Sequence, residues 1–176
     1  GAIGRTLNDA PTTVLAENHV RGADIAFGLA MRAYEFTAHK TAEARPKGPV
    51  TVMVASPEAV AAEATPMAAV AEGVFFTRDL VNEPANVLTT DDFAARLAAM
   101  QDLGLDVEIL EEADLEKLGM RALLGVGQGS ESPSKVVVMQ WKGGAEGAPP
   151  LALVGKGVVF DTGGISIKPA AGMEDM

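Results

Sequence analysis

The feature that most constrains the fold is a long helical pattern in the middle of the chain, from Pro57 to about Asn82. Its start carries three helix signals, since Ser56 suits the capping position, Pro57 the first turn, and Glu58 the positive end of the helix dipole. Pro66 interrupts the pattern and predicts a kink or a break. This helix divides the chain into a short N-terminal piece and a larger second piece.

Strand-like and helix-like segments alternate on both sides of this helix. Apolar and β-branched runs predict strands at 12–15, 50–55, 105–110, 135–141 and 151–154. Helical periodicity and start signals predict helices at 23–36, 89–101 and 111–118. The run at 50–55 has the form of a buried strand, and Gly125–Ser130 that of a glycine-rich loop. The alternation predicts an α/β fold with a parallel or mixed sheet.

The composition excludes several classes of protein. The chain has 176 residues, 48% of them hydrophobic, and 24 acidic against 14 basic residues give a net charge of −10. Such a chain folds, and its acidic surface disfavours nucleic acid as a partner. The absence of cysteine removes disulfides, thiolate zinc sites and cysteine nucleophiles. The two histidines, His19 and His39, lie in different segments, so they do not form a zincin pair.

No uninterrupted apolar run reaches the ~18 residues that a membrane helix needs, and no signal peptide is visible. We therefore expect a cytoplasmic protein that does not contact a membrane.

The stretch from Val154 to Lys168 carries the residues with the most chemistry. An apolar segment leads to Lys156 and Asp161 within a run of glycines, which let a backbone approach a ligand closely. A carboxylate can bridge two divalent metals, and a lysine amine beside such metals can lose its proton and bind one. A second, charged lysine can stabilise an oxyanion. The alternative is a surface ion pair worth ~0–1 kcal/mol.

Three stretches resemble the leucyl aminopeptidase (cytosol aminopeptidase) family. They are Val154–Pro169 with Ala171-Gly172-Met173, Arg78–Thr89, and Gly125–Ser130. Weaker similarity reaches back to Gly28–Phe36, so the resemblance covers most of the chain.

The resemblance implies a role for each matching residue. Lys156 matches a metal ligand and Asp161 the carboxylate that bridges both metals. Lys168 matches the lysine that helps to stabilise the tetrahedral intermediate. Met176 falls where the family lines the pocket for the substrate's N-terminal side chain. Thr162 replaces the family's usual serine and keeps the hydroxyl.

The implied protein is a metallo-exopeptidase that uses two divalent ions, Mn²⁺ or Zn²⁺. It removes apolar, leucine-like N-terminal residues from peptides by metal-activated water, and it assembles as a hexamer. Further family ligands lie in motifs that follow these residues, so the 176 residues alone are expected to be an inactive fragment. Residues 1–56 would end an α/β N-terminal domain, 57–82 would be an interdomain helix, and 83–176 would begin a catalytic domain with a mixed central sheet.

Three rival functions remain open from the residues themselves. A truncated aminopeptidase could act as a non-catalytic binding or assembly module. The Asp161-Thr162-Gly163 sequence also matches the local signature of aspartic proteases, although that class is all-β. The segment Val159–Gly164 resembles a phosphate-binding turn of sugar kinases and actin-like proteins.

Overall fold

The computed structural model describes residue 4 and residues 6–41 and 47–159. The chain divides into two compact units, Gly1–Asn82 and Glu83–Met176, and we describe each unit by itself. Both units combine α-helices with β-strands, so the chain is an α/β protein. Among the described residues the strands form two separate two-stranded sheets, one in each unit.

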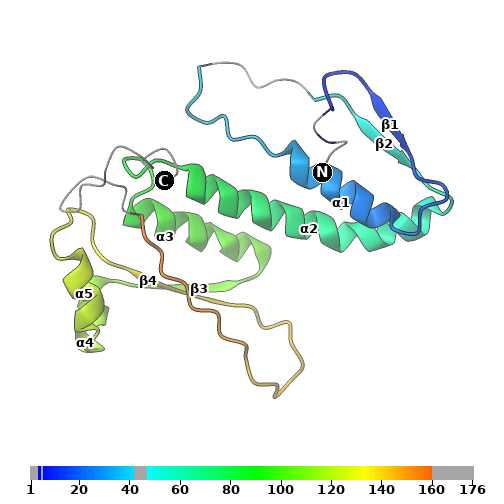
Figure 1. The fold of residues 1–176 in the computed structure, drawn as a ribbon. Helices are drawn as coiled ribbons and strands as arrows, with labels where there is room; N and C mark the ends of the chain where they lie inside the picture. Colours follow the sequence, from blue (N-terminus) through cyan, green and yellow to red (C-terminus); the bar gives the residue numbers. More distant parts are fainter. Residues whose placement is uncertain (1–3, 5, 42–46, 160–176) are drawn as a thin grey trace. The chain divides into compact units, whose positions relative to one another are not determined.

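The first unit is a strand–helix–strand arrangement followed by a long helix. Its elements are β1 (Thr12–Leu15), α1 (Gly22–Ala33), β2 (Val50–Met53) and α2 (Pro57–Asn82). β1 and β2 run parallel, with Thr12 opposite Val50 and Leu15 opposite Met53. Parallel strands need a crossover connection, and α1 lies in that connection and packs along α2 (Figure 1).

Small residues bring α1 close to its neighbours. A Cβ atom on Gly22 would lie 3.0 Å from Val54 Cγ1 and 3.2 Å from Val60 Cγ1, so a side chain there would press on both valines. Ala23 of α1 and Ala71 of α2 are buried as well. Alanine and glycine on α1 allow this helix to approach the end of β2 and the start of α2.

The structure confirms the predicted bounds of the long helix, which begins at Pro57 and ends at Asn82. Pro66 does not break it, because a proline removes one hydrogen bond and the turns on both sides remain bonded. The strand predicted at 50–55 is confirmed over Val50–Met53, but its predicted burial is wrong. Val50 is 38% and Met53 43% exposed, since a sheet of two strands covers little of its own surface.

By its length and composition alone, α2 is long and apolar enough to cross a membrane. An 18-residue window of the helix reaches a mean hydropathy of 1.3, and 6% of that window is buried inside the described structure. Core helices of other proteins pass the same test, so this property does not by itself identify a membrane segment.

The second unit is built around an antiparallel strand pair. Its elements are α3 (Thr90–Ala98), the 3₁₀-helix η2 (Ala99–Leu103), β3 (Asp106–Leu110), α4 (Glu112–Lys117), α5 (Arg121–Gly127) and β4 (Val136–Gln140). Asp106 pairs with Gln140 and Leu110 with Val136. The helices α4 and α5 form the connection and lie at one end of the strand pair (Figure 1). Leu115 on α4 is fully buried and is the centre of this small core.

The predicted start of α3 is confirmed by a capping box. The Thr89 hydroxyl accepts a hydrogen bond from the Asp92 backbone N–H at 3.3 Å, and Asp92 Oδ2 accepts one from the Thr89 backbone N–H at 3.5 Å. These contacts satisfy backbone donors that the first helical turn leaves unpaired. The 3₁₀-helix that continues α3 ends at Gly104, whose φ of 87° lies in the left-handed region that favours glycine.

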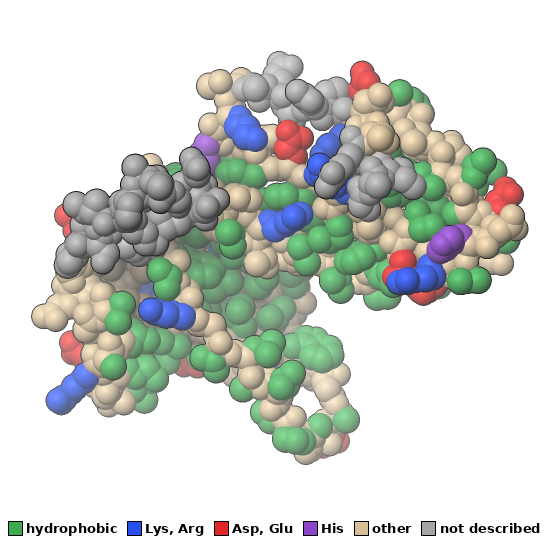
Figure 2. Space-filling model, viewed as in Figure 1, with side chains coloured by type: hydrophobic (Ala, Val, Ile, Leu, Met, Phe, Trp, Pro, Cys, Tyr) green, Lys and Arg blue, Asp and Glu red, His purple; other side chains and the backbone are tan. Residues whose placement is uncertain are grey.

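Two predictions in this unit are wrong. The segment 151–154 is not a strand in the structure, and Leu151, Leu153 and Val154 are 86%, 88% and 98% exposed. Figure 2 shows hydrophobic side chains, in green, along the loop that follows β4. An apolar run becomes a strand only where a neighbouring strand supplies hydrogen bonds, and none of the described residues does so here. The predicted loop at Gly125–Ser130 is helical as far as Gly127.

Candidate active site

The segment that carries the candidate metal ligands is described only in part. Lys156 lies in the described region, whereas Asp161, Lys168 and Met176 lie outside the described residues, as does Thr162. The structure therefore places one of the predicted site residues and leaves the positions of the others as predictions.

Lys156 lies on a tight turn between two glycines. Its backbone carbonyl accepts a hydrogen bond from the Val158 N–H at 3.0 Å, so the chain turns around Gly157. A Cβ on Gly157 would lie 2.8 Å from Cε1 of Phe93, a residue of α3 in the same unit. No atom of the described residues lies within 4 Å of a Cβ built on Gly155. Among these residues, the turn is therefore held on one side by an aromatic ring and open on the other.

The Lys156 side chain suits a metal-binding role in one respect. It is exposed, and in the described part of the chain its amine has no carboxylate partner. An unpaired amine nitrogen together with the Asp161 carboxylate would give a nitrogen and oxygen donor set, which suits Zn²⁺ and Mn²⁺. The residues fit a divalent metal by their chemistry. Within the described residues no group of three or more His, Asp or Glu side chains forms a metal site by itself.

The motif from Arg78 to Asn82 anchors the end of α2 to the end of α1. The Tyr34 hydroxyl donates to Asp79 Oδ1 at 2.8 Å and accepts from Asn82 Nδ2 at 3.0 Å. The Arg78 guanidinium carbon lies 4.8 Å from the centre of the Tyr34 ring. Burial raises the pKa of the Tyr34 phenol, and the hydrogen bond to Asp79 raises it further, while Asn82 opposes this. These contacts give this part of the motif a structural role.

The loop that follows this helix end has structural contacts too. Glu83 is 6% exposed, and its carboxylate pairs with Arg96 of α3 at 2.9 Å. The Pro84 carbonyl accepts from the N–H groups of Val87 and Leu88, both at 2.9 Å. The loop is thus tied both to itself and to α3.

Lys135 is a charged centre of the second unit that sequence reasoning missed. Its side chain is 11% exposed, and its ammonium lies 2.9 Å from Asp91 Oδ1 and 2.5 Å from Glu111 Oε2. The hydrogen bond to Glu111, and then that to Asp91, raise the pKa of Lys135. Glu111 itself remains 53% exposed, and the neighbouring Glu112 accepts the Ser134 N–H at 2.8 Å.

The two histidines have local contacts in the first unit. His19 Nδ1 accepts the Arg21 N–H at 3.1 Å, just before α1. The His39 ring lies 5.8 Å from the Phe36 ring. Both contacts join residues that are two or three positions apart, so they are local to the chain.

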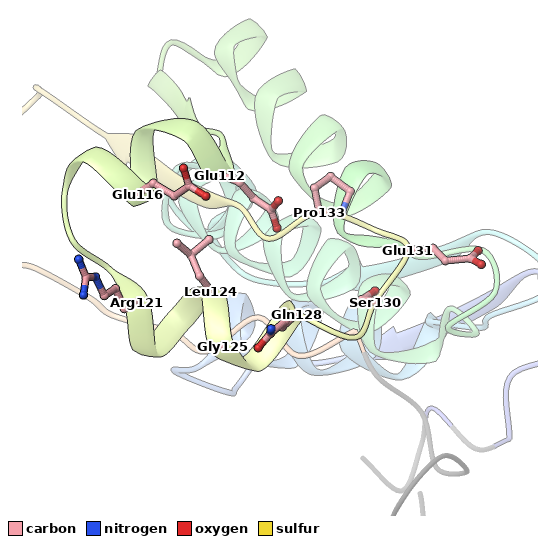
Figure 3. A pocket seen from close by; sticks show the side chains of 10 residues that line it. Glu112, Glu116, Arg121, Leu124, Gly125, Gln128, Ser130, Glu131 and Pro133 are labelled. Carbon is pink, nitrogen blue, oxygen red and sulfur yellow. The ribbon is translucent and has the colours of Figure 1, made fainter.

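A cavity of about 710 Å³ lies beside α4 and α5, and its lining includes Glu112, Glu116, Arg121, Gln128 and Glu131 (Figure 3). Lys156, the candidate site residue that the structure describes, does not line it. The glycine-rich stretch 125–130 contributes to its wall. Three carboxylates against one guanidinium make the cavity unfavourable for an anion.

Comparisons with known proteins agree with the resemblance seen in the motifs. The probable cytosol aminopeptidase of Cereibacter sphaeroides is 77% identical over 176 residues, which is 100% of this chain and 36% of that protein. The corresponding protein of Dinoroseobacter shibae is 63% identical over 174 residues, 99% of this chain and 36% of its own length. The chain thus spans about a third of the length of these relatives.

A solved structure of the bottromycin maturation enzyme BotP in complex with Mn is similar in fold, with a TM-score of 0.66 and 35% sequence identity. The match covers 86% of this chain and 31% of BotP. A model of the cytosol aminopeptidase family, catalytic domain, matches residues 75–176, more than half of the chain. Residues 75–176 include Lys156, Asp161 and Lys168, and the chain belongs to the cytosol aminopeptidase family.

Proposed function

We propose that this chain supplies part of the active site of a metal-dependent aminopeptidase, which releases apolar, leucine-like residues from the N-termini of peptides. The observation that carries the proposal is the match of residues 75–176 to the family's catalytic domain, because this range holds every candidate site residue. The exposed amine of Lys156, which has no carboxylate partner among the described residues, is compatible with that role.

Lys156 and Asp161 are the proposed ligands in this chain for two divalent ions. Mn²⁺ and Zn²⁺ are the candidates, and the similar enzyme BotP was solved in complex with Mn. When bound, such ions polarise the substrate carbonyl and provide a nucleophilic water at neutral pH. Asp161 would contribute one carboxylate shared between the two ions, and Lys156 a neutral amine to one of them.

The remaining site residues act on the substrate. Lys168 carries a positive charge that would stabilise the negative charge that develops on the carbonyl oxygen during attack. Met176 would contact the apolar side chain of the substrate's first residue. A flexible thioether adapts to several apolar shapes, which fits a preference for leucine-like residues.

Residues 1–176 alone are proposed to be inactive, since the chain spans about a third of its relatives and two ligands do not hold two metals. A cytoplasmic location and a homo-hexamer are proposed for the active protein. A non-catalytic assembly module is the alternative. That alternative predicts no turnover, with or without metal, both in the segment 1–176 and in the longest natural polypeptide that contains it.

The test uses the longest natural polypeptide that contains residues 1–176. It is stripped of metal with a chelator, and hydrolysis of a chromogenic leucine substrate is measured before and after Mn²⁺ or Zn²⁺ is added. The proposal expects turnover that depends on the metal and exceeds that on a glutamate substrate. The segment 1–176 is measured in parallel and is expected to show none. Equal rates with and without metal would contradict the proposal.

A further inference from the structure

We propose that Phe93 is a positioning residue for Lys156, because its ring packs on Gly157 and holds the turn that presents the lysine. This inference rests on the proposed function, since it assigns a purpose to the turn only if Lys156 binds metal. It adds a residue on α3 to the site, far from Lys156 in the sequence.

The Phe93 ring lies close to Gly157, and its atoms are the nearest to the place where a Cβ would stand. A Cβ on Gly157 would lie 2.8 Å from Cε1, 3.5 Å from Cδ1 and 3.8 Å from Cζ of the Phe93 ring. A separation below 3.0 Å requires that something shifts, and an aromatic ring is a rigid unit with two side-chain torsions. The ring therefore occupies the space in which any side chain at position 157 would lie.

The turn transmits this contact to Lys156. The hydrogen bond from the Val158 N–H to the Lys156 carbonyl, 3.0 Å long, closes the turn around Gly157. A displacement of Gly157 would move both of its neighbours, because peptide planes are rigid and adjacent residues share one. Lys156 directly precedes Gly157, so its amine would move with the turn.

Phe93 is well supported for such a role. It lies in the first turn of α3, and its N–H donates to the Thr89 carbonyl at 2.9 Å. The capping box between Thr89 and Asp92 fixes this turn, and the next residue, Ala94, is 3% exposed. Metal ligands need support within about 0.5 Å of their productive position, and an element of fixed structure provides it better than a loop.

Gly155 offers a matched control on the other side of Lys156. No described atom lies within 4 Å of a Cβ built on Gly155, so a methyl group fits there among the described residues. G155A and G157A add the same atom to the same segment, one residue away from Lys156 in each direction. They differ in the presence of the Phe93 ring.

The experiment measures the dissociation constant for Mn²⁺ by calorimetry, using the longest natural polypeptide that contains these residues. Loss of support for a metal ligand costs about 10–100-fold in metal affinity, and this is the loss expected for G157A. G155A is expected to stay within about 2-fold of the wild type, as for a substitution into open space. The double variant F93L/G157A should recover affinity relative to G157A, because the smaller leucine leaves room for the added methyl group.

Hydrogen exchange at residues 154–159 gives a second measurement, independent of metal. G157A and F93A should both speed exchange there in the metal-free protein, with little change elsewhere, and G155A should not. F93A adds no atom at position 157 and therefore tests the support even if G157A does not fold. Equal effects of G157A and G155A on Mn²⁺ affinity, or unchanged exchange in F93A, would overturn the role of Phe93. A wild-type protein that binds no Mn²⁺ would overturn the proposed function, and this inference with it.

Discussion

Lys135 offers a direct test of how the second unit is held together. Its ammonium binds Asp91 in the first turn of α3 and Glu111 at the cap of α4, and Lys135 itself directly precedes β4. One charge thus links three elements. We predict that K135M, which keeps most of the aliphatic stem but removes the charge, destabilises this unit.

The expected loss of stability in K135M follows from the solvent exposure of Lys135 and its two partners. The Lys135 side chain is 11% exposed, whereas those of Asp91 and Glu111 are 58% and 53% exposed. Removal of the ammonium therefore returns both carboxylates to water and leaves no buried charge unpaired. Exposed ion pairs contribute ~0.2–1 kcal/mol, and hydrogen bonds to charged groups about 1.5–3 kcal/mol. A mostly buried lysine with solvent-screened partners lies between these limits, at about 1–2 kcal/mol for both contacts together.

Urea unfolding followed by circular dichroism measures this loss. For an m-value of about 2 kcal/mol/M, the midpoint of K135M should fall by about 0.5–1 M relative to the wild type. K117M is the control, because Lys117 is 75% exposed and pairs with Asp114 at 3.1 Å within one helix. That exposed pair should leave the midpoint unchanged within error.

The dependence on pH gives an independent check. The pKa of Lys135 is raised in the folded chain above its ordinary value of 10.5, so the folded state binds its proton more tightly than the unfolded state. The contribution of Lys135 is therefore complete below about pH 10.5 and is lost as pH rises through the folded pKa. The difference in urea unfolding midpoint between the wild type and K135M should become smaller in that alkaline range. Equal midpoints for K135M and K117M at neutral pH would refute the reasoning.

Three further predictions concern other parts of the chain. G127A should be less stable than G125A, because a Cβ at position 127 would overlap the Ser134 hydroxyl and force that side chain to rotate, whereas a Cβ at position 125 on the same helix meets no described atom. G125A should stabilise the chain by about 0.5–1 kcal/mol, and thermal unfolding compares the two variants. The pKa of Tyr34, the single tyrosine, is raised above 10.0 by burial and a carboxylate, so its ultraviolet titration midpoint should exceed 10 and stability should decline as pH rises through it. In the longest natural polypeptide, D161A should abolish metal-dependent turnover with the fold intact, and K168A should lower kcat by about 10²–10³-fold; normal turnover in D161A would remove that residue from the metal site.

Features that depend on neighbours in the sequence were predicted well. Pro57 marks the first residue of α2, and Thr89 with Asp92 marks the start of α3, where the capping contact joins residues within one helical turn. The two strands of the second unit were predicted separately, at 105–110 and 135–141, and the structure confirms both and pairs them antiparallel. The family was recognisable from three ordered motifs, since the residues of each motif are contiguous.

Features that depend on distant residues needed the tertiary structure. Lys135 carries no local sign of its role, because its partners lie 24 and 44 positions earlier, at 111 and 91. The helix α5 extends through glycines of low helical propensity, which shows that tertiary context overrides local preference.

The candidate site shows the same division of information. The type and order of its residues, Lys156, Asp161 and Lys168, are properties of the sequence, because side-chain chemistry does not depend on the fold. The packing of Phe93 on Gly157 joins positions in α3 and in the lysine turn, and no periodicity or spacing relates them. Only the path of the folded chain brings that ring to that glycine, since contacts between distant residues arise from the packing of whole elements.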